Sequence, residues 1–272
     1  MPELPKEDYL EQRCLLCDEP TDIRPVPQQR IIEKMDEYMS RRDYAGAERH
    51  LLYWLEEAKL GQDQRGELMI RNELVGHFRK TGSREQAFLN AKEALRLIDQ
   101  LQFEGTISSG TTYTNIATAC NAFGENEKAL ELFEKARTVY ESSPATRPDL
   151  LGGLYNNMAL TCVALKRFAE AWDLYRKALE TMEKVPNGEL EQAITYLNMA
   201  DAEEAEFGPE EAEKKVFEYL DTAWELLNRP ETKRDGYYAF VCEKCAPSFE
   251  YYGYFLAAGQ LKERAEDIYA RA

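Results

Sequence analysis

Apolar residues recur at helical spacing along most of the chain. In two consecutive stretches they fall at i, i+3, i+4 and i+7, which is the period of a helix with one buried face. Short polar segments divide each stretch in two, FGENEK at 123–128 and LKRFAE at 165–170. Each stretch is therefore predicted to form a helix, a tight turn and a second helix.

These helical hairpins repeat at a nearly constant interval. The cluster Tyr-x-Asn-apolar-Ala occurs at 113–117, 155–159 and 196–200. Its asparagines lie 42 and 41 residues apart (157 − 115 = 42, 198 − 157 = 41). In the first two copies an alanine, an aromatic residue and a second alanine follow at identical offsets: Ala129, Phe133 and Ala136, then Ala171, Tyr175 and Ala178. Small residues let antiparallel helices approach closely, and the aromatic ring fills the space beside them.

The same frame predicts an all-α superhelix of about five to six hairpins. After an extension at 1–27, where prolines 20, 25 and 27 exclude a helix, the repeats are predicted at 28–60, 64–101, 107–143, 148–184, 188–228 and 233–271. An insertion of about one helical turn is expected near 207–213. Pro247 is expected to kink or restart its helix, and the last second helix is expected to be short.

The repeated motif resembles the tetratricopeptide repeat. Its usual period of about 34 residues is lengthened here to about 42, which is similar to the form in kinesin light chains and bacterial peptide-sensing regulators. The resemblance is strongest over 107–184 and weakest over 28–60 and 233–271. It implies an α-solenoid whose first helices line a concave groove that binds a peptide or a partner helix.

The resemblance places the repeated asparagines, Asn115, Asn157 and Asn198, in a ladder along that groove. A carboxamide both donates and accepts hydrogen bonds, so it can hold a peptide backbone of any sequence. Nearby positions expected to face the same groove add four candidate peptide-binding residues: Asn156, Thr118, Asn121 and Asp201. The alternative is that the asparagines bond a neighbouring helix and fix the angle between helices.

The strongly acidic composition narrows the choice of partner. Asp and Glu number 50 against 34 Lys and Arg, a net charge of −16. Such a surface repels phosphate backbones, so nucleic acid and anionic membranes are not expected partners. The only expected groove cations, Arg71, Arg79 and Lys80, lie in one repeat, so a neutral or basic peptide fits better than an acidic one. Neither a signal peptide nor a membrane span is found in the sequence, which predicts a cytoplasmic location.

Four cysteines form two CxxC pairs, Cys14 with Cys17 and Cys242 with Cys245. Together they could hold zinc, but both pairs lie in helical sequence and at opposite ends of an open solenoid. Buried thiols are therefore favoured and no cofactor is expected, unless the N-terminal segment folds back or a partner chain supplies ligands. Cys120 and Cys162 occupy equivalent positions in adjacent repeats and are expected in the core.

No catalytic motif is recognised. The two histidines, His50 and His77, have no HExxH spacing, and neither a GxSxG motif nor a glycine-rich phosphate loop occurs. A non-enzymatic interaction scaffold is therefore predicted. The alternative is a self-association or assembly module, possibly a homodimer, that uses the aromatic-rich segment 237–255 and possibly a CxxC-based zinc site.

Overall fold

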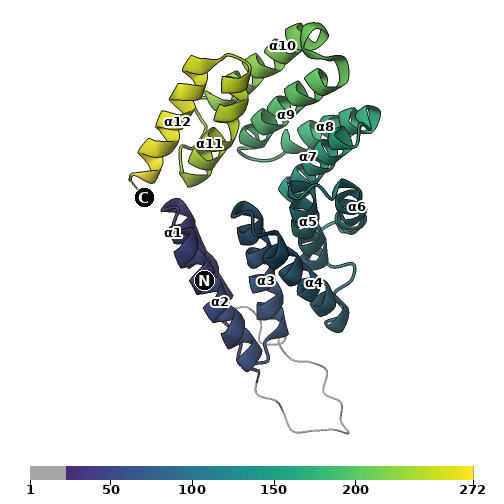
Figure 1. The fold of residues 1–272 in the computed structure, drawn as a ribbon, viewed down its shortest axis with the longest axis vertical. Helices are drawn as coiled ribbons and strands as arrows, with labels where there is room; N and C mark the ends of the chain where they lie inside the picture. The colour runs from purple at the N-terminus through teal and green to yellow at the C-terminus, as the bar shows by residue number, and fades with distance from the viewer. Residues whose placement is uncertain (1–22, 272) are drawn as a thin grey trace.

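The computed structural model describes residues 23–271, and this part of the chain contains twelve helices and no strand (Figure 1). The helices are α1 (Gln28–Ser40), α2 (Tyr44–Leu60), α3 (Gln64–Lys80), α4 (Arg84–Gln100), α5 (Ile107–Ala122), α6 (Asn126–Ser142), α7 (Pro148–Ala164), α8 (Phe168–Met182), α9 (Glu189–Phe207), α10 (Pro209–Leu227), α11 (Gly236–Tyr251) and α12 (Phe255–Tyr269). Consecutive helices pair into six hairpins, and the predicted all-α solenoid is confirmed. Within 23–271, no helix is both long and apolar enough to cross a lipid bilayer.

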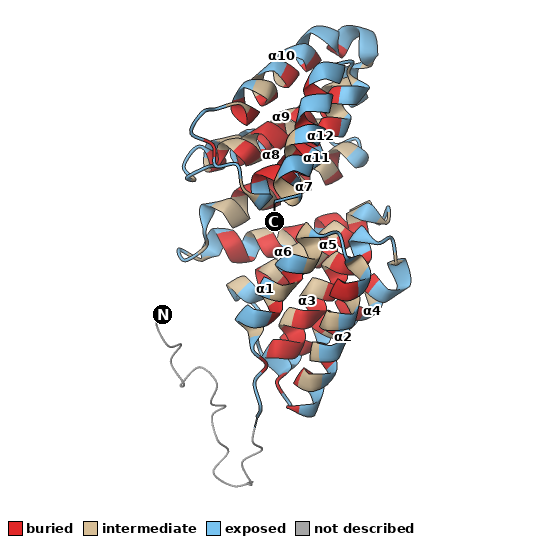
Figure 2. Cartoon of the chain, turned by 90° about the vertical axis from the view of Figure 1, so that its left-hand side faces the viewer, coloured by how far each residue is buried: buried red, intermediate tan, exposed pale blue. Residues whose placement is uncertain are grey.

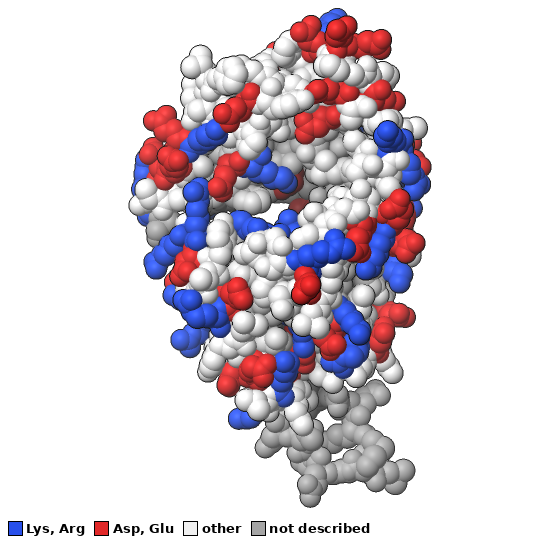
Figure 3. Space-filling model, viewed as in Figure 1, with Lys and Arg blue, Asp and Glu red and all other residues white. Residues whose placement is uncertain are grey.

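The odd-numbered helices form the inner layer of the array. From α3 to α11 each of them packs against the next odd-numbered helix, as well as against its own hairpin partner. The array curves around an open centre in Figure 1, and the space-filling view in Figure 3 shows a hollow there. From α3 to α11 the first helix of each repeat therefore faces the concave side, as the repeat motif implied.

Small and aromatic residues build the core where the helices meet. Phe133 and Tyr175 are fully buried among the alanines of their hairpins, and Cys120 and Cys162 are buried beside them. Figure 2 shows the buried residues as stripes along facing helices. Three hydrophobic clusters follow one another along the array and overlap in sequence, spanning 26–87, 68–202 and 190–265. Each hairpin thus depends on its neighbours for burial.

Each hairpin turn contains one residue in the left-handed region of backbone space. These residues are Arg42, Gly82, Gly124, Lys166, Gly208 and Gly253. A left-handed residue ends a helix and lets the chain reverse, and glycine adopts this conformation with the least strain. Gly208, with φ 81° and ψ 163°, is the single residue between α9 and α10.

Three expectations concern the fifth and sixth hairpins. The insertion of about one helical turn expected near 207–213 is present as added helix length, since α9 and α10 have 19 residues each. Helix α11 continues through Pro247 without restarting. The expected short last helix is wrong, since α12 has 15 residues, the same length as α8.

The segment before α1 is held by the turn between α2 and α3. The Arg24 N–H donates to the Gly61 carbonyl at 2.9 Å, and the Val26 N–H donates to the Asp63 carboxylate at 2.9 Å. Val26 is buried in the core of the first hairpins. This contact fixes where the superhelix begins.

The two ends of the array meet, which the sequence did not suggest. The Arg42 guanidinium, in the α1–α2 turn, lies 2.8 Å from the Glu243 carboxylate of α11 and 5.5 Å from the centre of the Tyr269 ring at the end of α12. Figure 1 shows the first hairpin beside the end of the last one. The expectation of an open solenoid with distant ends is therefore wrong, because curvature accumulated over the repeats brings them together.

Candidate functional site

Two of the predicted ladder residues have unpaired carboxamides on the inner layer. Asn115 on α5 and Asn157 on α7 are half-buried, and neither side chain has a hydrogen-bond partner within the described part of the chain. Asn115 also lines a hollow of about 440 Å³ formed by α1, α3, α5 and the loop before α5. Both amides therefore have unused hydrogen-bonding capacity. Asn121, near the end of α5, is half-buried and its side chain is likewise unpaired within residues 23–271.

The other predicted site residues have internal partners. The Asn198 amide donates to the Asn156 carbonyl oxygen at 3.1 Å. Asn156 is buried between α7 and α9 and does not face the groove, since one residue along a helix turns the side chain by about 100°. The Thr118 hydroxyl donates to the Thr114 carbonyl at 2.8 Å, and Asp201 accepts from the Tyr252 hydroxyl at 2.9 Å.

Tyrosine–carboxylate pairs join the inner helices α9 and α11. The Tyr251 hydroxyl donates to Glu204 at 3.0 Å, and Tyr237 donates to Glu191 in the same way as Tyr252 donates to Asp201. Burial raises the pKa of Asp201, and the nearby Glu204 carboxylate adds to this effect. The polar groups of the C-terminal part of the inner layer therefore largely satisfy one another.

The expected groove cations are mostly engaged elsewhere. Arg71 is buried, and its guanidinium pairs with Glu67 at 2.6 Å and donates to Asn90 at 3.1 Å, so its expected place in the groove is wrong. Lys80 lies 5.2 Å from the ring centre of Tyr44. Arg79 has no ion pair among residues 23–271, and burial lowers its pKa.

One inner residue at the repeated position escaped the sequence analysis. Glu73 on α3 lies 42 residues before Asn115 (115 − 73 = 42), and it is half-buried with no hydrogen-bond or ion-pair partner among the described residues. It also lines the 440 Å³ hollow beside Asn115. The 42-residue spacing would have found it, but a search for asparagine alone passed over it.

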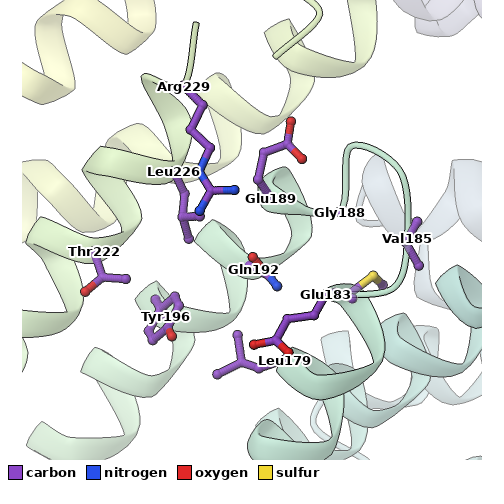
Figure 4. A pocket seen from close by; sticks show the side chains of 11 residues that line it. Leu179, Glu183, Val185, Gly188, Glu189, Gln192, Tyr196, Thr222, Leu226 and Arg229 are labelled. Carbon is purple, nitrogen blue, oxygen red and sulfur yellow. The ribbon is translucent and has the colours of Figure 1, made fainter. Parts of the chain in front are cut away.

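A second hollow, of about 340 Å³, lies between the end of α8, the start of α9 and the end of α10 (Figure 4). Arg229, Glu189, Gln192 and Glu183 project toward it, and Glu189 already accepts from the Thr232 hydroxyl at 2.9 Å. Among the residues that line it, no side-chain polar atom is both buried and unpaired. No polar group that lines this hollow therefore needs a ligand to complete its hydrogen bonds.

The pair of Cys242 and Cys245 offers little to a metal. Cys242 and Cys245 are buried in the core of the last hairpins, and burial raises the pKa of Cys242 and raises that of Cys245 to about 12. Zinc requires thiolates, which such burial disfavours. Cys14 and Cys17 lie outside the described residues, and within 23–271 no group of three His, Cys, Asp or Glu side chains is placed to hold a metal ion.

The aromatic-rich segment 237–255 is divided between core and surface. Tyr238 and Phe249 are fully buried, and the Tyr238 hydroxyl donates to the Leu227 carbonyl at 3.1 Å. At the turn into α12, Phe255 is 68% exposed and the adjoining Leu256 is 86% exposed. Tyr251 is 70% exposed as well, so the segment presents exposed aromatic rings at several points, and the adjoining Leu256 extends the exposed apolar surface at its end.

Comparison with known proteins agrees with this architecture, which is an α-solenoid of helical hairpins. Residues 150–216 match the Tetratricopeptide repeat family. BtubC (BKLC) from P. vanneervenii is similar in structure, with a TM-score of 0.50 and 18% sequence identity over 91% of this chain and 92% of that chain. A putative kinesin light chain from Podosopora anserina with nearly identical TPR-like repeats has a TM-score of 0.48 and 15% identity over 74% of this chain and 94% of that chain.

The comparison by sequence with curated proteins finds no match. At 18% identity the likeness to BtubC shows the fold alone. The match to tetratricopeptide repeats thus covers residues 150–216, within a chain whose fold is an α-solenoid of helical hairpins.

Proposed function

We propose that this protein is a non-enzymatic scaffold that holds a peptide or a partner helix in its concave groove, along α3, α5 and α7. Tetratricopeptide repeats are generally non-catalytic protein-interaction scaffolds. The observation that carries the proposal is the pair of unpaired carboxamides, Asn115 and Asn157, on adjacent inner helices. Asn198, by contrast, is hydrogen-bonded to Asn156, so the ligand contacts are assigned to the first two rungs of the ladder.

The charge of the chain supports a neutral or basic ligand. The net charge is −16. Arg71, the cation nearest the middle of α3, forms an ion pair with Glu67. With its guanidinium paired inside the core, Arg71 provides no site for acidic side chains or phosphates. Nucleic acid and anionic membranes are therefore not proposed as partners.

The test is a selection from a library of random peptides displayed on phage, with the intact protein as bait. The affinity of the selected peptides is then measured by fluorescence anisotropy for the protein, for an Asn115→Ala/Asn157→Ala variant and for Asn198→Ala. The last variant is the matched control, since it removes an amide of the same ladder that already has an internal partner. Circular dichroism establishes that all three proteins are folded.

Loss of about tenfold or more in affinity is expected for the double variant, because each amide contributes hydrogen bonds to the peptide backbone. Asn198→Ala is expected to bind as the unmodified protein does. Failure to select any peptide, or equal affinities for all three proteins, would contradict the proposal.

A second candidate function is self-association through the exposed apolar turn at Phe255 and Leu256. These residues border a hollow of about 450 Å³ that Trp224 and Tyr254 also line. Exposed apolar side chains beside such a hollow are suited to protein contact. Light scattering of the protein and of Leu256→Asp tests this: a dimer that the substitution dissociates supports it, and a monomer at high concentration excludes it.

A further inference from the structure

The hollow between α1, α3 and α5 is lined by a carboxylate at a position where α5, α7 and α9 carry an amide. Glu73 stands one repeat before Asn115 at the same position of the motif, and both residues line the hollow. The buried positions of α3 recur in α5 after 42 residues, so the two side chains occupy equivalent places on their helices. The ladder of amides thus begins with a negative charge.

The amide of Asn72, beside Glu73, leaves a buried acceptor without a partner. The Asn72 amide nitrogen donates to the Thr112 hydroxyl at 2.9 Å, and that hydroxyl donates its only hydrogen to the Ser108 carbonyl at 3.0 Å. Thr112 can therefore only accept from Asn72, which fixes the orientation of the amide. The Asn72 Oδ1 atom is buried and unpaired, and its residue lines the hollow. A buried acceptor of this kind requires a donor.

Glu73 adds a second unsatisfied acceptor, and this one is charged. It has no cationic partner among the described residues, and burial raises its pKa, an effect to which Asp36 of α1 adds. The cation in the wall, Arg65, is stacked on Phe103 with 5.2 Å between guanidinium and ring centre. Met69 and Leu68 supply apolar walls that suit an alkyl chain.

We propose that this hollow binds a primary ammonium group of the groove ligand, with Glu73, Asn72 Oδ1 and the Asn115 carbonyl oxygen as its acceptors. An ammonium group is compact and has three donors, as many as the acceptors named here. A guanidinium presents a planar fork that favours a bidentate carboxylate. The inference rests on the proposed function in so far as the ammonium belongs to the bound peptide.

The test uses n-butylammonium, which reproduces the end of a lysine side chain. Its binding is followed by the NMR signals of the Asn72 and Asn115 side-chain amides, in the protein and in Glu73→Gln. Glu183→Gln is the matched control, since it removes the same charge from the hollow between α8, α9 and α10. Nα-acetyl-lysine methylamide and glycinamide then distinguish a lysine side chain from a peptide N-terminus, and n-butylguanidinium tests the selectivity for ammonium.

We expect saturable shifts of both amides, weakened about tenfold or more by Glu73→Gln, because a charged hydrogen bond is lost. Glu183→Gln is expected to bind unchanged. Absence of saturable shifts, equal shifts in Glu73→Gln, or equal binding of the guanidinium would overturn the proposal. If the protein binds butylammonium but selects no peptide, the proposed function is contradicted while the ammonium site is supported. The two proposals can therefore fail separately.

Discussion

The buried ion pair between Glu67 and Arg71 gives a sharp test of how the second hairpin is held together. The two side chains are only 10% and 8% exposed, and Arg71 contacts the Glu67 carboxylate through Nε at 2.7 Å and Nη2 at 2.6 Å. Removing the guanidinium with Arg71→Leu leaves the carboxylate buried and unpaired, which typically costs about 3–5 kcal/mol of unfolding free energy. Replacing both partners by leucine removes the desolvated charges together, and this is often nearly neutral.

Asn90 sets the expected cost of the double replacement. Its carbonyl oxygen accepts from Arg71 at 3.1 Å, while its amide donates to the Gln86 carbonyl at 2.9 Å. Losing the first of these bonds leaves one buried acceptor unpaired, so the Glu67→Leu/Arg71→Leu protein should lose only about 1–3 kcal/mol.

Urea unfolding followed by circular dichroism, on the protein, both single variants and the double variant, completes the cycle. The reasoning predicts that the double variant is more stable than Arg71→Leu. A loss of less than about 1 kcal/mol for Arg71→Leu would refute it, because water would then be solvating the carboxylate. It would also be refuted if the losses of the two single variants summed to the loss of the double variant.

Four further predictions concern the turns, the groove and the ring closure. Lys166→Gly should raise the unfolding free energy by up to about 1 kcal/mol, because lysine is strained at φ 58°; urea unfolding checks this, and a loss contradicts it. Gly208→Ala should cost about 1–3 kcal/mol in the same assay, since φ 81° and ψ 163° suit only glycine. The raised pKa of Glu73 means that the folded state holds its proton more tightly. As pH rises from the pKa of Glu73 in the unfolded chain through its pKa in the folded protein, the unmodified protein should therefore lose stability relative to Glu73→Gln. The melting temperatures of the two proteins should agree at about pH 4, and that of the unmodified protein should be the lower one at about pH 7. Arg42→Glu should increase the radius of gyration in X-ray scattering by separating the ends, and adding Glu243→Arg should restore it; an unchanged radius would show that the pair closes nothing.

The sequence predicted the fold well because the fold depends on local spacing. Alanines at constant offsets and an aromatic residue between them report where two helices touch, and Phe133 and Tyr175 are fully buried where this spacing placed them. The shifted offsets near Gly208 predicted an insertion of about one helical turn, and the structure contains it as two longer helices joined by that single glycine. Of the two outcomes expected at Pro247, a kink or a restart, the restart does not occur, because α11 continues through this residue.

The candidate site was less predictable, because it depends on contacts between helices that are distant in sequence. Asn157 and Asn198 share a motif, yet only the second finds a partner, on the preceding inner helix. Arg71 was expected in the groove from its position in the repeat. That position does not reveal that Glu67, one turn earlier, pairs with it inside the core. Closure through Arg42 and Glu243 joins residues 201 positions apart, and no local pattern reports such a contact.

The inner layer thus divides into two parts that differ in what they leave unsatisfied. On α9 and α11 the carboxylates of Asp201 and Glu204 are capped by tyrosine hydroxyls, so a ligand there would have to displace bonds already made. On α3 and α5, Glu73 and Asn115 have no partner, and Asn72 has only one of its two polar atoms paired. Because binding gains most where polar groups are already desolvated and unpaired, the N-terminal half of the groove is where a ligand costs least to bind.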